Sequence, residues 1–315
     1  MEKLRIVFMG TPEFAVGILD TIIKGNYEVV GVITAADKPA GRGQKLKYSA
    51  VKEYALANNL TLLQPTNLKD ETFLTELKSL NANLQVVVAF RMLPEAVWRM
   101  PKLGTFNLHA SLLPNYRGAA PINWAIINGE TKTGVTTFFI DDKIDTGAMI
   151  LSKETAIGPE ESAGELHDRL MDLGSEAVID TLLLIENGKV STTIQVDNAD
   201  IKTAYKLNKD NCKIDWHKSA SEIHNLIRGL SPYPAAWCYF KDNGEEWNVK
   251  LYDAKVMAES HSYSVGQIIT TKKEIKVAVQ DGFIQILSLQ LPGKKKMAAQ
   301  ELLNGVSFSE RAQAE

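Results

Sequence analysis

The chain has 315 residues, of which 45% are hydrophobic and 23% are charged, and its formal net charge is −3. These values are ordinary for a globular protein of about two domains, and they exclude a chain that binds nucleic acid through a strongly basic overall charge. Any RNA-binding site must therefore be a local basic patch. Cys212 and Cys238 are too few for a disulfide framework, so we expect reduced structural thiols.

Long apolar runs are missing from the sequence. No run approaches the ~18 residues of a membrane span. The N-terminal residues before Gly10 contain only a short apolar run, Ile6 to Met9, which we interpret as a strand and not as a signal peptide. We therefore expect a cytoplasmic protein that does not contact membranes.

A strand, a turn and a helix open the chain. Leu4 to Met9 has the pattern of a buried parallel strand, Thr11 is a candidate N-cap, and Pro12 suits the first helical position. Apolar residues then follow at helical spacing up to Gly25, and Tyr27 to Thr34 is a second strand. This unit predicts a doubly wound, mostly parallel α/β sheet. The turn matches neither GxGxxG nor GxxxxGK[ST], which disfavours a dinucleotide or P-loop site.

Residues 35–48 show no apolar periodicity. The segment carries two glycines and four cations: Gly41, Gly43, Lys38, Arg42, Lys45 and Lys47. We expect a mobile surface loop, because nothing in the pattern supplies a core anchor. Such a glycine-rich, cationic loop could also clamp phosphate groups.

Capping residues and periodicity predict further elements before residue 190. The expected helices are Ser49 to Asn58, Phe73 to Leu80, Ala119 to Asn128, and Ser162 to about Asn187 behind a Ser162–Glu165 capping box. The expected strands are Leu60 to Leu63, Leu84 to Phe90, one that ends at His109, and Val135 to Ile140. We expect Trp124 to pack in the core and His167 to lie on the surface without a role.

Polar residues that could form an acyl-transfer site lie around two neighbouring strands. Asn107 and His109 are two residues apart, so strand alternation points them to the same side. The carboxylates Asp141, Asp142 and Asp145 follow the next strand. We expect adjacent strand ends to bring these groups together, so that an amide and an imidazole bind an oxyanion while a carboxylate moves protons. A core histidine and a solvated acidic turn would fit the same spacing.

From Val190 the pattern changes to that of a linker and a second, smaller domain. We place the first domain at 1–189, the linker at 190–205 and a C-terminal domain at 206–315. A Ser219–Glu222 capping box opens one helix there. The expected strands are Ala235 to Phe240, Trp247 to Val256, Val265 to Thr270, Ile275 to Val279, and Phe283 to Gln290, with hairpin signals at Asn243-Gly244 and Asp281-Gly282. This pattern predicts a small OB-like β-barrel.

Lysines gather on the linker and the second domain. They include Lys202, Lys206, Lys209, Lys213, Lys272, Lys273, Lys276 and Lys294 to Lys296. A solvated face explains such clustering as well as an RNA site does.

Five segments carry a resemblance to a known family. Asn107-x-His109-x-Ser111-Leu112-Leu113-Pro114 with Tyr116-Arg117-Gly118, and Asp141 to Gly147, resemble the signature of the 10-formyltetrahydrofolate-dependent formyltransferases. Met9 to Ala15, Ala36 to Leu46 and Arg228 to Trp237 are similar to the branch that formylates charged tRNA. The resemblance runs in order along essentially the whole chain. It supports a Rossmann-like formyltransferase domain followed by an OB-like domain.

The resemblance implies a reaction and a set of partners. The formyl group of 10-formyltetrahydrofolate would pass to the α-amino group of methionine on initiator methionyl-tRNA, for translation initiation, and tetrahydrofolate would leave. We expect a monomer with no metal, because the sequence contains no ligand cluster for one.

Site residues are carried over position by position. The catalytic residues would be Asn107, His109 and Asp145, with His109 held protonated by Asp145. The folate-binding residues would be Ser111, Leu112, Leu113, Pro114, Arg91, Leu93 and Asp142. The tRNA-binding residues would be Arg42, Lys38, Lys45, Lys206 and Lys209. Arg228 and Tyr233 would serve domain packing.

Other functions share parts of these patterns. A formyltransferase that acts on glycinamide ribonucleotide or an amino-sugar nucleotide, or a formyltetrahydrofolate hydrolase, would use the same Asn107, His109 and Asp145. An RNA-binding module with an inactive α/β domain is a third alternative, although the intact amide, imidazole and carboxylate argue against it. The basic loop and the lysine-bearing second domain favour a large polyanionic substrate over a small amine.

Overall fold

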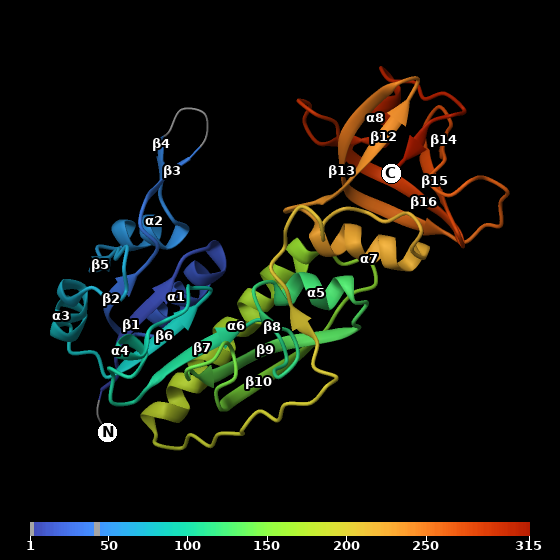
Figure 1. Ribbon diagram of the computed structural model, residues 1–315. Coiled ribbons are helices and arrows are strands. Elements are labelled where there is room, and N and C mark those ends of the chain that lie inside the picture. Colours follow the sequence, from blue (N-terminus) through green and yellow to red (C-terminus); the bar gives the residue numbers. More distant parts are fainter. Residues whose placement is uncertain (1–2, 41–44) are drawn as a thin grey trace. The chain divides into compact units, whose positions relative to one another are not determined.

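The computed structural model describes residues 3–40 and 45–315 (Figure 1). The chain forms two compact units. The first comprises residues 1–121, 133–155 and 167–203, and the second comprises 122–132, 156–166 and 204–315. The second unit therefore also takes in two short stretches that precede residue 190, and the domain boundaries expected from composition remain a prediction. Of the helices in the described ranges, none combines the length and apolar character that a bilayer crossing requires.

A seven-stranded sheet is the centre of the first unit, in the order β10-β9-β7-β6-β1-β2-β5. Its strands are β1 (Arg5–Gly10), β2 (Glu28–Ile33), β5 (Leu62–Leu63), β6 (Leu84–Val88), β7 (Thr105–His109), β9 (Lys132–Phe139) and β10 (Met149–Ala156). The five strands from β5 to β7 are parallel, and β9 runs antiparallel to β7. The mostly parallel sheet predicted from the sequence is therefore confirmed. Sequence order reverses beside β1, as in doubly wound folds.

Helices cover both faces of this sheet. They are α1 (Glu13–Lys24), α2 (Ala50–Ala57), α3 (Glu71–Ser79), α4 (Glu95–Trp98) and α6 (Ala163–Glu186). The helix α5 (Pro121–Ile127) belongs almost entirely to the second unit. On one face α6 packs directly on β7, since a Cβ added to Gly174 would lie 2.8 Å from the side chain of Leu108. On the other face, Met9 and Val87 share an apolar cluster with Phe73 of α3. Asn107 pairs in register with Val87, so it lies on this second face.

Some predicted helix starts are confirmed and one is wrong. Ser49 caps α2 by accepting a hydrogen bond from the Lys52 amide, and Ser162 and Glu165 form the reciprocal bonds of a capping box. Thr11 is not the N-cap of α1. The N-cap is Pro12, whose extended backbone (ψ 178°) places it before the helix and not inside it.

Two short strands occur where the sequence predicted only a loop. β3 (Lys38–Ala40) and β4 (Lys45–Lys47) pair as an antiparallel ribbon, with Lys38 opposite Lys47. Three-residue strands of this composition give no periodic signal, which explains why the sequence did not indicate them. Arg42 lies between them, outside the described residues.

The second unit is an antiparallel barrel with one long helix. Its elements are β11 (Thr203–Ala204, at the unit boundary), α7 (Ala220–Leu230), β12 (Ala236–Asp242), β13 (Glu245–Met257), β14 (Ile268–Thr270), β15 (Ile275–Val279), β16 (Gly282–Gln290), β17 (Met297–Ala298), α8 (Ala299–Leu303) and β18 (Gln313–Ala314). The sheet order is β14-β15-β16-β13-β12-β18, and β17 pairs with β16. The edge strands meet where Gln267 bridges Gln313 and the Ile268 amide donates to the Ala312 carbonyl. The predicted OB-like barrel is confirmed.

Both predicted hairpins are present, and one turn is shifted. Asn243 and Gly244 have φ angles of 48° and 83° and connect β12 to β13, as expected for an Asn-Gly turn. In the β15–β16 hairpin Val279 pairs with Gly282, so the two turn residues are Gln280 and Asp281. The sequence had placed this turn one residue later, at Asp281-Gly282.

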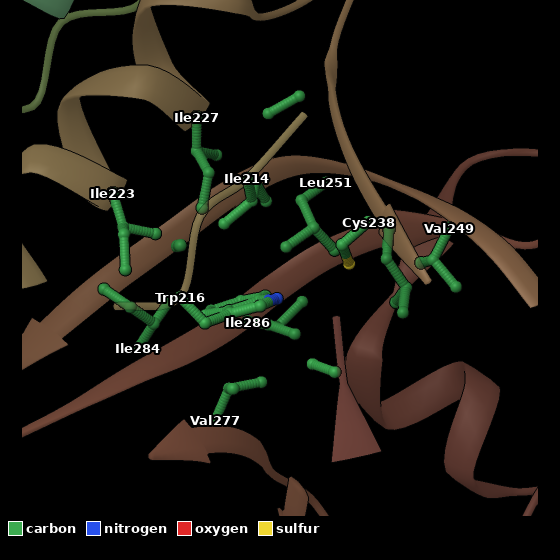
Figure 2. Packing of buried hydrophobic residues seen from close by; sticks show 14 of the residues in the cluster. Ile214, Trp216, Ile223, Ile227, Cys238, Val249, Leu251, Val277, Ile284 and Ile286 are labelled. Atoms are coloured by element: carbon green, nitrogen blue, oxygen red, sulfur yellow. The ribbon is translucent and has the colours of Figure 1, made fainter. Parts of the chain in front are cut away.

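The barrel core is continuous with the inner face of α7. Figure 2 shows the indole of Trp216 among Ile223, Ile284 and Ile286, all of which belong to one buried cluster. Cys238 lies in the same cluster and, like Cys212, is a free buried thiol. The expected reduced cysteines are therefore confirmed.

Candidate active site

Asn107 and His109 lie on one face of β7, as alternation predicted. His109 is 7% exposed, and its Nε2 donates a hydrogen bond to the Tyr116 carbonyl at 2.7 Å. The side-chain oxygen of Asn107 is buried and has no partner among the described residues. Buried amide oxygens without partners are rare in folded proteins, so this one marks a position where a ligand can complete the hydrogen bonding.

Asp145 reaches His109 by a different route from the one predicted. Because β9 is antiparallel to β7, Phe139 pairs with Phe106, and the carboxyl end of β9 lies away from His109. The expectation of adjacent carboxyl ends was therefore wrong. The loop of residues 140–148 returns across the sheet, and Asp145 Oδ2 lies 3.8 Å from His109 Nδ1.

The loop has no room for a side chain at its close approach to the sheet. A Cβ built on Gly147 would lie 1.7 Å from the Phe139 carbonyl oxygen. A glycine is required here because a main-chain atom cannot move aside as the tip of a flexible side chain can.

Tyr116 and Gly118 hold the two ionisable groups, and Arg117 between them bonds to Gln195. Tyr116 provides the carbonyl for His109, and the Gly118 amide donates to Asp145 Oδ2 at 2.9 Å. Between them, Arg117 donates from Nε and Nη2 to Gln195 Oε1 at 3.0 and 2.8 Å. Gly118 has φ 119°, a conformation that favours glycine, so the Tyr-Arg-Gly sequence suits this turn.

The other carboxylates of the loop differ in their surroundings. Asp141 accepts hydrogen bonds from the Lys143 amide at 3.1 Å and from the Thr146 hydroxyl at 2.8 Å, so it shapes the loop. Asp142 is exposed. Of the acidic cluster, only Asp145 is brought to His109.

The segment Ser111 to Pro114 is anchored through Thr136 of β9. The Thr136 hydroxyl donates to the Ser111 carbonyl at 2.8 Å and accepts from the Leu113 amide at 3.2 Å. The Ser111 hydroxyl donates to the Asn115 carbonyl at 2.7 Å, so this side chain serves the loop itself. Leu112 and Pro114 are half-buried, whereas Leu113 is buried.

Arg91 and Leu93 follow β6, whose last residue, Val88, pairs with Leu108. The Arg91 guanidinium donates to the main-chain carbonyls of Thr66 and Pro65, and Leu93 packs in the apolar cluster of the second face. Their side chains therefore bind the protein itself, and the folate-binding assignment of both residues stays a prediction.

The residues predicted to bind tRNA are spread along the chain. Arg42 lies outside the described residues, and Lys38 and Lys45 are described only as backbone in β3 and β4. Lys206 and Lys209 are exposed on the second unit, and Lys209 Nζ lies 5.1 Å from the centroid of the Trp237 ring.

The two residues expected to serve domain packing behave differently. Arg228 is buried and donates to the carbonyls of Gly158 and Glu161 at 3.2 and 3.0 Å, all within the second unit. Burial lowers the pKa of its guanidinium below the usual range. Tyr233 is 82% exposed, so it packs little within its own unit, and its role in domain packing stays a prediction. An aromatic residue between two prolines gave no signal of this exposure.

The sequence also predicted the surroundings of Trp124 and His167. Trp124 is half-buried, its Nε1 donates to the Tyr205 carbonyl at 2.7 Å, and its ring meets that of Tyr205 edge to face. It therefore lies at the edge of the packed residues, and the expectation that it packs in the core was wrong. His167 is more enclosed than a fully exposed surface residue, because its ring contacts Phe14 at a centroid distance of 5.2 Å.

The described part of the chain has no group of three or more His, Cys, Asp or Glu residues arranged to hold a metal ion.

The residues that sequence reasoning missed are Thr136 and Gln195. Neither belongs to a charge cluster. The one hint of Gln195 in the sequence was Arg117 in the Tyr116-Arg117-Gly118 motif. An arginine there needs a hydrogen-bond acceptor, but the motif does not show which residue provides it.

The first unit has a doubly wound sheet with an amide, an imidazole and a carboxylate near one face, and the second is an OB-like barrel. This combination indicates a group-transfer enzyme with a two-domain architecture. The model of the formyl transferase family matches residues 4–182, and that of the formyl transferase C-terminal domain matches residues 206–307. The chain belongs to the formyl transferase family.

Curated relatives match over their whole length. The methionyl-tRNA formyltransferase of Flavobacterium johnsoniae is 79% identical over 99% of both chains, and that of Bacteroides thetaiotaomicron is 53% identical over 98% of both. Among solved structures, the sugar 3N-formyl transferase WlaRD has a TM-score of 0.65 at 24% identity, covering 94% of this chain and 100% of that one. HypX from Aquifex aeolicus with tetrahydrofolic acid has a TM-score of 0.66 at 17% identity, covering 98% and 49%. These structures share the fold.

Proposed function

We propose that this protein transfers the formyl group of 10-formyltetrahydrofolate to the α-amino group of methionine on initiator methionyl-tRNA. The observation that carries the proposal is the 79% identity to a methionyl-tRNA formyltransferase over 99% of both chains. The site supports it, since Asn107, His109 and Asp145 meet on one face of the sheet. The product would serve translation initiation.

Asn107 would stabilise the charge that develops on the formyl oxygen. Its side-chain amide has a buried oxygen without a partner in the described ranges, so the protein does not use the group fully. An amide N–H placed against a developing oxyanion in a water-poor site lowers the barrier more than it could in water. The unpartnered oxygen is an acceptor, so it could receive an N–H of a bound substrate while Nδ2 donates to the oxyanion.

His109 is restricted to one role by its hydrogen bond. Nε2 is engaged by the Tyr116 carbonyl, so only Nδ1 remains for the reacting groups and Asp145. If Asp145 held His109 protonated, Nδ1 would add a charged donor to the oxyanion. The 3.8 Å separation from Asp145 Oδ2 is too long for a direct hydrogen bond but short enough for electrostatic attraction.

Asp145 would take the proton that the amine must lose. Free α-amino groups have a pKa of about 7.7–8.0, so a protonated substrate first gives one proton to solvent, and the neutral amine then attacks. When the amine nitrogen bonds to the formyl carbon, it releases a proton to Asp145, directly or through water. The bond from that carbon to N10 then breaks, and N10 gains a proton, so the net reaction moves one formyl group and one proton.

The formyl donor would lie beside the loops at this face. Ser111 to Pro114, with Arg91, Leu93 and Asp142, would line the folate site, mostly through main-chain groups. The hydrogen bonds from Thr136 would keep the Ser111–Pro114 segment in one conformation. The donor is a co-substrate, and the proposal requires no metal.

Charged tRNA would contact the basic residues of both parts of the chain. Arg42, Lys38 and Lys45 would hold the acceptor end, and Lys206 and Lys209 would bind backbone phosphates at the start of the 206–315 domain. Phosphate contacts of this kind supply sequence-independent affinity that weakens as salt rises.

The decisive experiment compares substrates directly. The protein is incubated with labelled 10-formyltetrahydrofolate and charged initiator tRNA, and in parallel with glycinamide ribonucleotide and an amino-sugar nucleotide. We expect rapid transfer to methionyl-tRNA only. Preferential transfer to either small amine would overturn the proposal, and release of formate without transfer would indicate a hydrolase.

A further inference from the structure

Gln195 makes four hydrogen bonds at the base of the Asp145 loop. Its Nε2 donates to the carbonyls of Asp145 and Gly147 at 2.9 and 2.8 Å, and its Oε1 accepts two bonds from Arg117. The side chain is 9% exposed, although it lies in a stretch with the composition of a linker. All four residues belong to the first unit.

These contacts satisfy the amide completely. A glutamine has two N–H donors and one oxygen with two lone pairs, and all four positions are occupied. The Arg117 fork also fixes which way the amide faces, since a guanidinium can only donate. If the amide were turned over, its N–H groups would face the N–H groups of Arg117, and its oxygen would face the carbonyls of Asp145 and Gly147. The network therefore has one arrangement.

The Asp145 backbone needs such support. Its φ of 55° lies in the left-handed region, which is unfavourable for a residue with a side chain. The Gly118 amide holds the carboxylate, and Gln195 holds the carbonyl of the same residue. Two bonds from two separate segments thus fix both ends of Asp145.

The segment that carries Gln195 is itself anchored. Thr193 and Met149 exchange main-chain hydrogen bonds of 2.8 and 2.9 Å, and Arg117 Nη1 lies 2.6 Å from the carboxylate of Asp197. The main-chain pairing with Met149 therefore presents Gln195 to the loop from a fixed backbone, whereas the ion pair with the largely exposed Asp197 adds little.

We propose that Gln195 is a positioning residue that, together with Arg117, holds Asp145 in its catalytic orientation. The inference rests on the role of Asp145 in the proposed function. Gln195 has no part in bond making, and it acts only through the Asp145 loop. The stretch after residue 190 is thus a structural part of the active site as well as a connection to the barrel.

A double-mutant cycle tests this inference. Gln195→Ala should lower kcat at least about tenfold with little change in either KM, because small displacements of a catalytic group are costly. In an Asp145→Ala background, the same change should cost less than about twofold, since Gln195 then has nothing to position. Multiplicative losses in the double variant would overturn the inference.

A second variant and a control separate positioning from folding. Gln195→Glu keeps an acceptor for Arg117 but loses both donors to the loop, so it should fold and still lose activity. Asp197→Ala removes only an ion pair with a carboxylate that is largely exposed, and it should leave kcat within about twofold. Full activity of Gln195→Glu would contradict the proposal.

Amide hydrogen exchange provides a readout that does not depend on the reaction. Amides of residues 141–147 should exchange several-fold faster in Gln195→Ala and Gln195→Glu than in Asp197→Ala, because the loop loses its tether. Unchanged exchange would overturn the positioning role whatever the substrate. Failure of the wild-type protein to formylate methionyl-tRNA would instead overturn the proposed function, while the exchange result would still decide on Gln195.

Discussion

His109 faces Asp145 with Nδ1, at 3.8 Å from Oδ2, because its Nε2 is engaged by the Tyr116 carbonyl. The two groups are close enough to interact electrostatically but too far apart for a direct hydrogen bond. The carboxylate is tethered instead by the Gly118 amide at 2.9 Å. The protein thus fixes each of the two groups through a main-chain partner, Tyr116 for His109 and Gly118 for Asp145.

Removing the side chain of Asn107, His109 or Asp145 should lower the turnover rate strongly and the stability of the fold only slightly. We expect Asn107→Ala, His109→Ala and Asp145→Ala each to lower kcat at least about a hundredfold, the usual scale for an oxyanion donor or an acid–base group. His167→Ala provides a matched control, since this histidine lies in the same unit but away from β7. Steady-state rates and melting temperatures should be measured together. Near-normal turnover in a folded variant would remove that residue from the mechanism.

Thr136→Val should loosen the segment Ser111 to Pro114. Valine keeps the volume but loses the hydroxyl, so the buried Leu113 amide would be left without its acceptor at a cost of about 1–3 kcal/mol. We expect the KM for 10-formyltetrahydrofolate to rise several-fold and the KM for tRNA to change little.

Thr181→Val is the control for that substitution. Thr181 is also a buried threonine, and its hydroxyl lies 2.8 Å from that of Thr137, on the face covered by α6. It should lose comparable stability without affecting the folate KM. Equal KM values in both variants would show that Thr136 has no bearing on folate.

The sequence predicted those features that local patterns determine. Ser49, the Ser162–Glu165 box and the Asn243-Gly244 turn act within four residues, so their capping and turn preferences are visible in the sequence. Asn107 and His109 follow from strand alternation alone.

The remaining features depend on contacts between distant segments. The direction of β9 relative to β7 decides on which side Asp145 emerges, and no local pattern records it. Gln195 meets the Asp145 loop only after about 50 intervening residues have folded between them, and a single polar residue in a coil has no periodicity.

Protonation of His224 should destabilise the second unit. Burial lowers the pKa of this histidine from its ordinary 6.5, and the nearby Arg228 lowers it further, against an opposing effect from Glu160. Below pH 6.5 the unfolded chain therefore binds a proton that the folded chain resists, so the free energy of unfolding should fall as pH decreases. His224→Gln should flatten this dependence, whereas His217→Gln, at an exposed histidine, should not. Chemical denaturation at several pH values between 5 and 8 would measure it.

Both thiols should be unreactive in the folded protein. Burial raises the pKa of Cys238 and of Cys212, and no side-chain surface of Cys238 reaches solvent. Because the thiolate is the reactive form, a thiol reagent at pH 8 should modify neither residue rapidly. Addition of denaturant should expose two thiols per chain. Fast labelling of either cysteine under native conditions would show that the barrel core opens readily.

Arg42→Ala should weaken the use of charged tRNA and spare the folate site. A guanidinium can hold a phosphate through two donors, whereas lysine offers a point charge, so Arg42→Lys should recover only part of the loss. We expect a higher KM for tRNA and a lower kcat, because a misplaced acceptor end loses alignment with the formyl donor. Arg99→Ala, which removes an exposed arginine paired with Glu95, is the matched control. Kinetics with each substrate varied at saturation of the other would separate the effects. If Arg42→Ala raised the folate KM and left tRNA unaffected, the segment 35–48 would belong to the folate site instead.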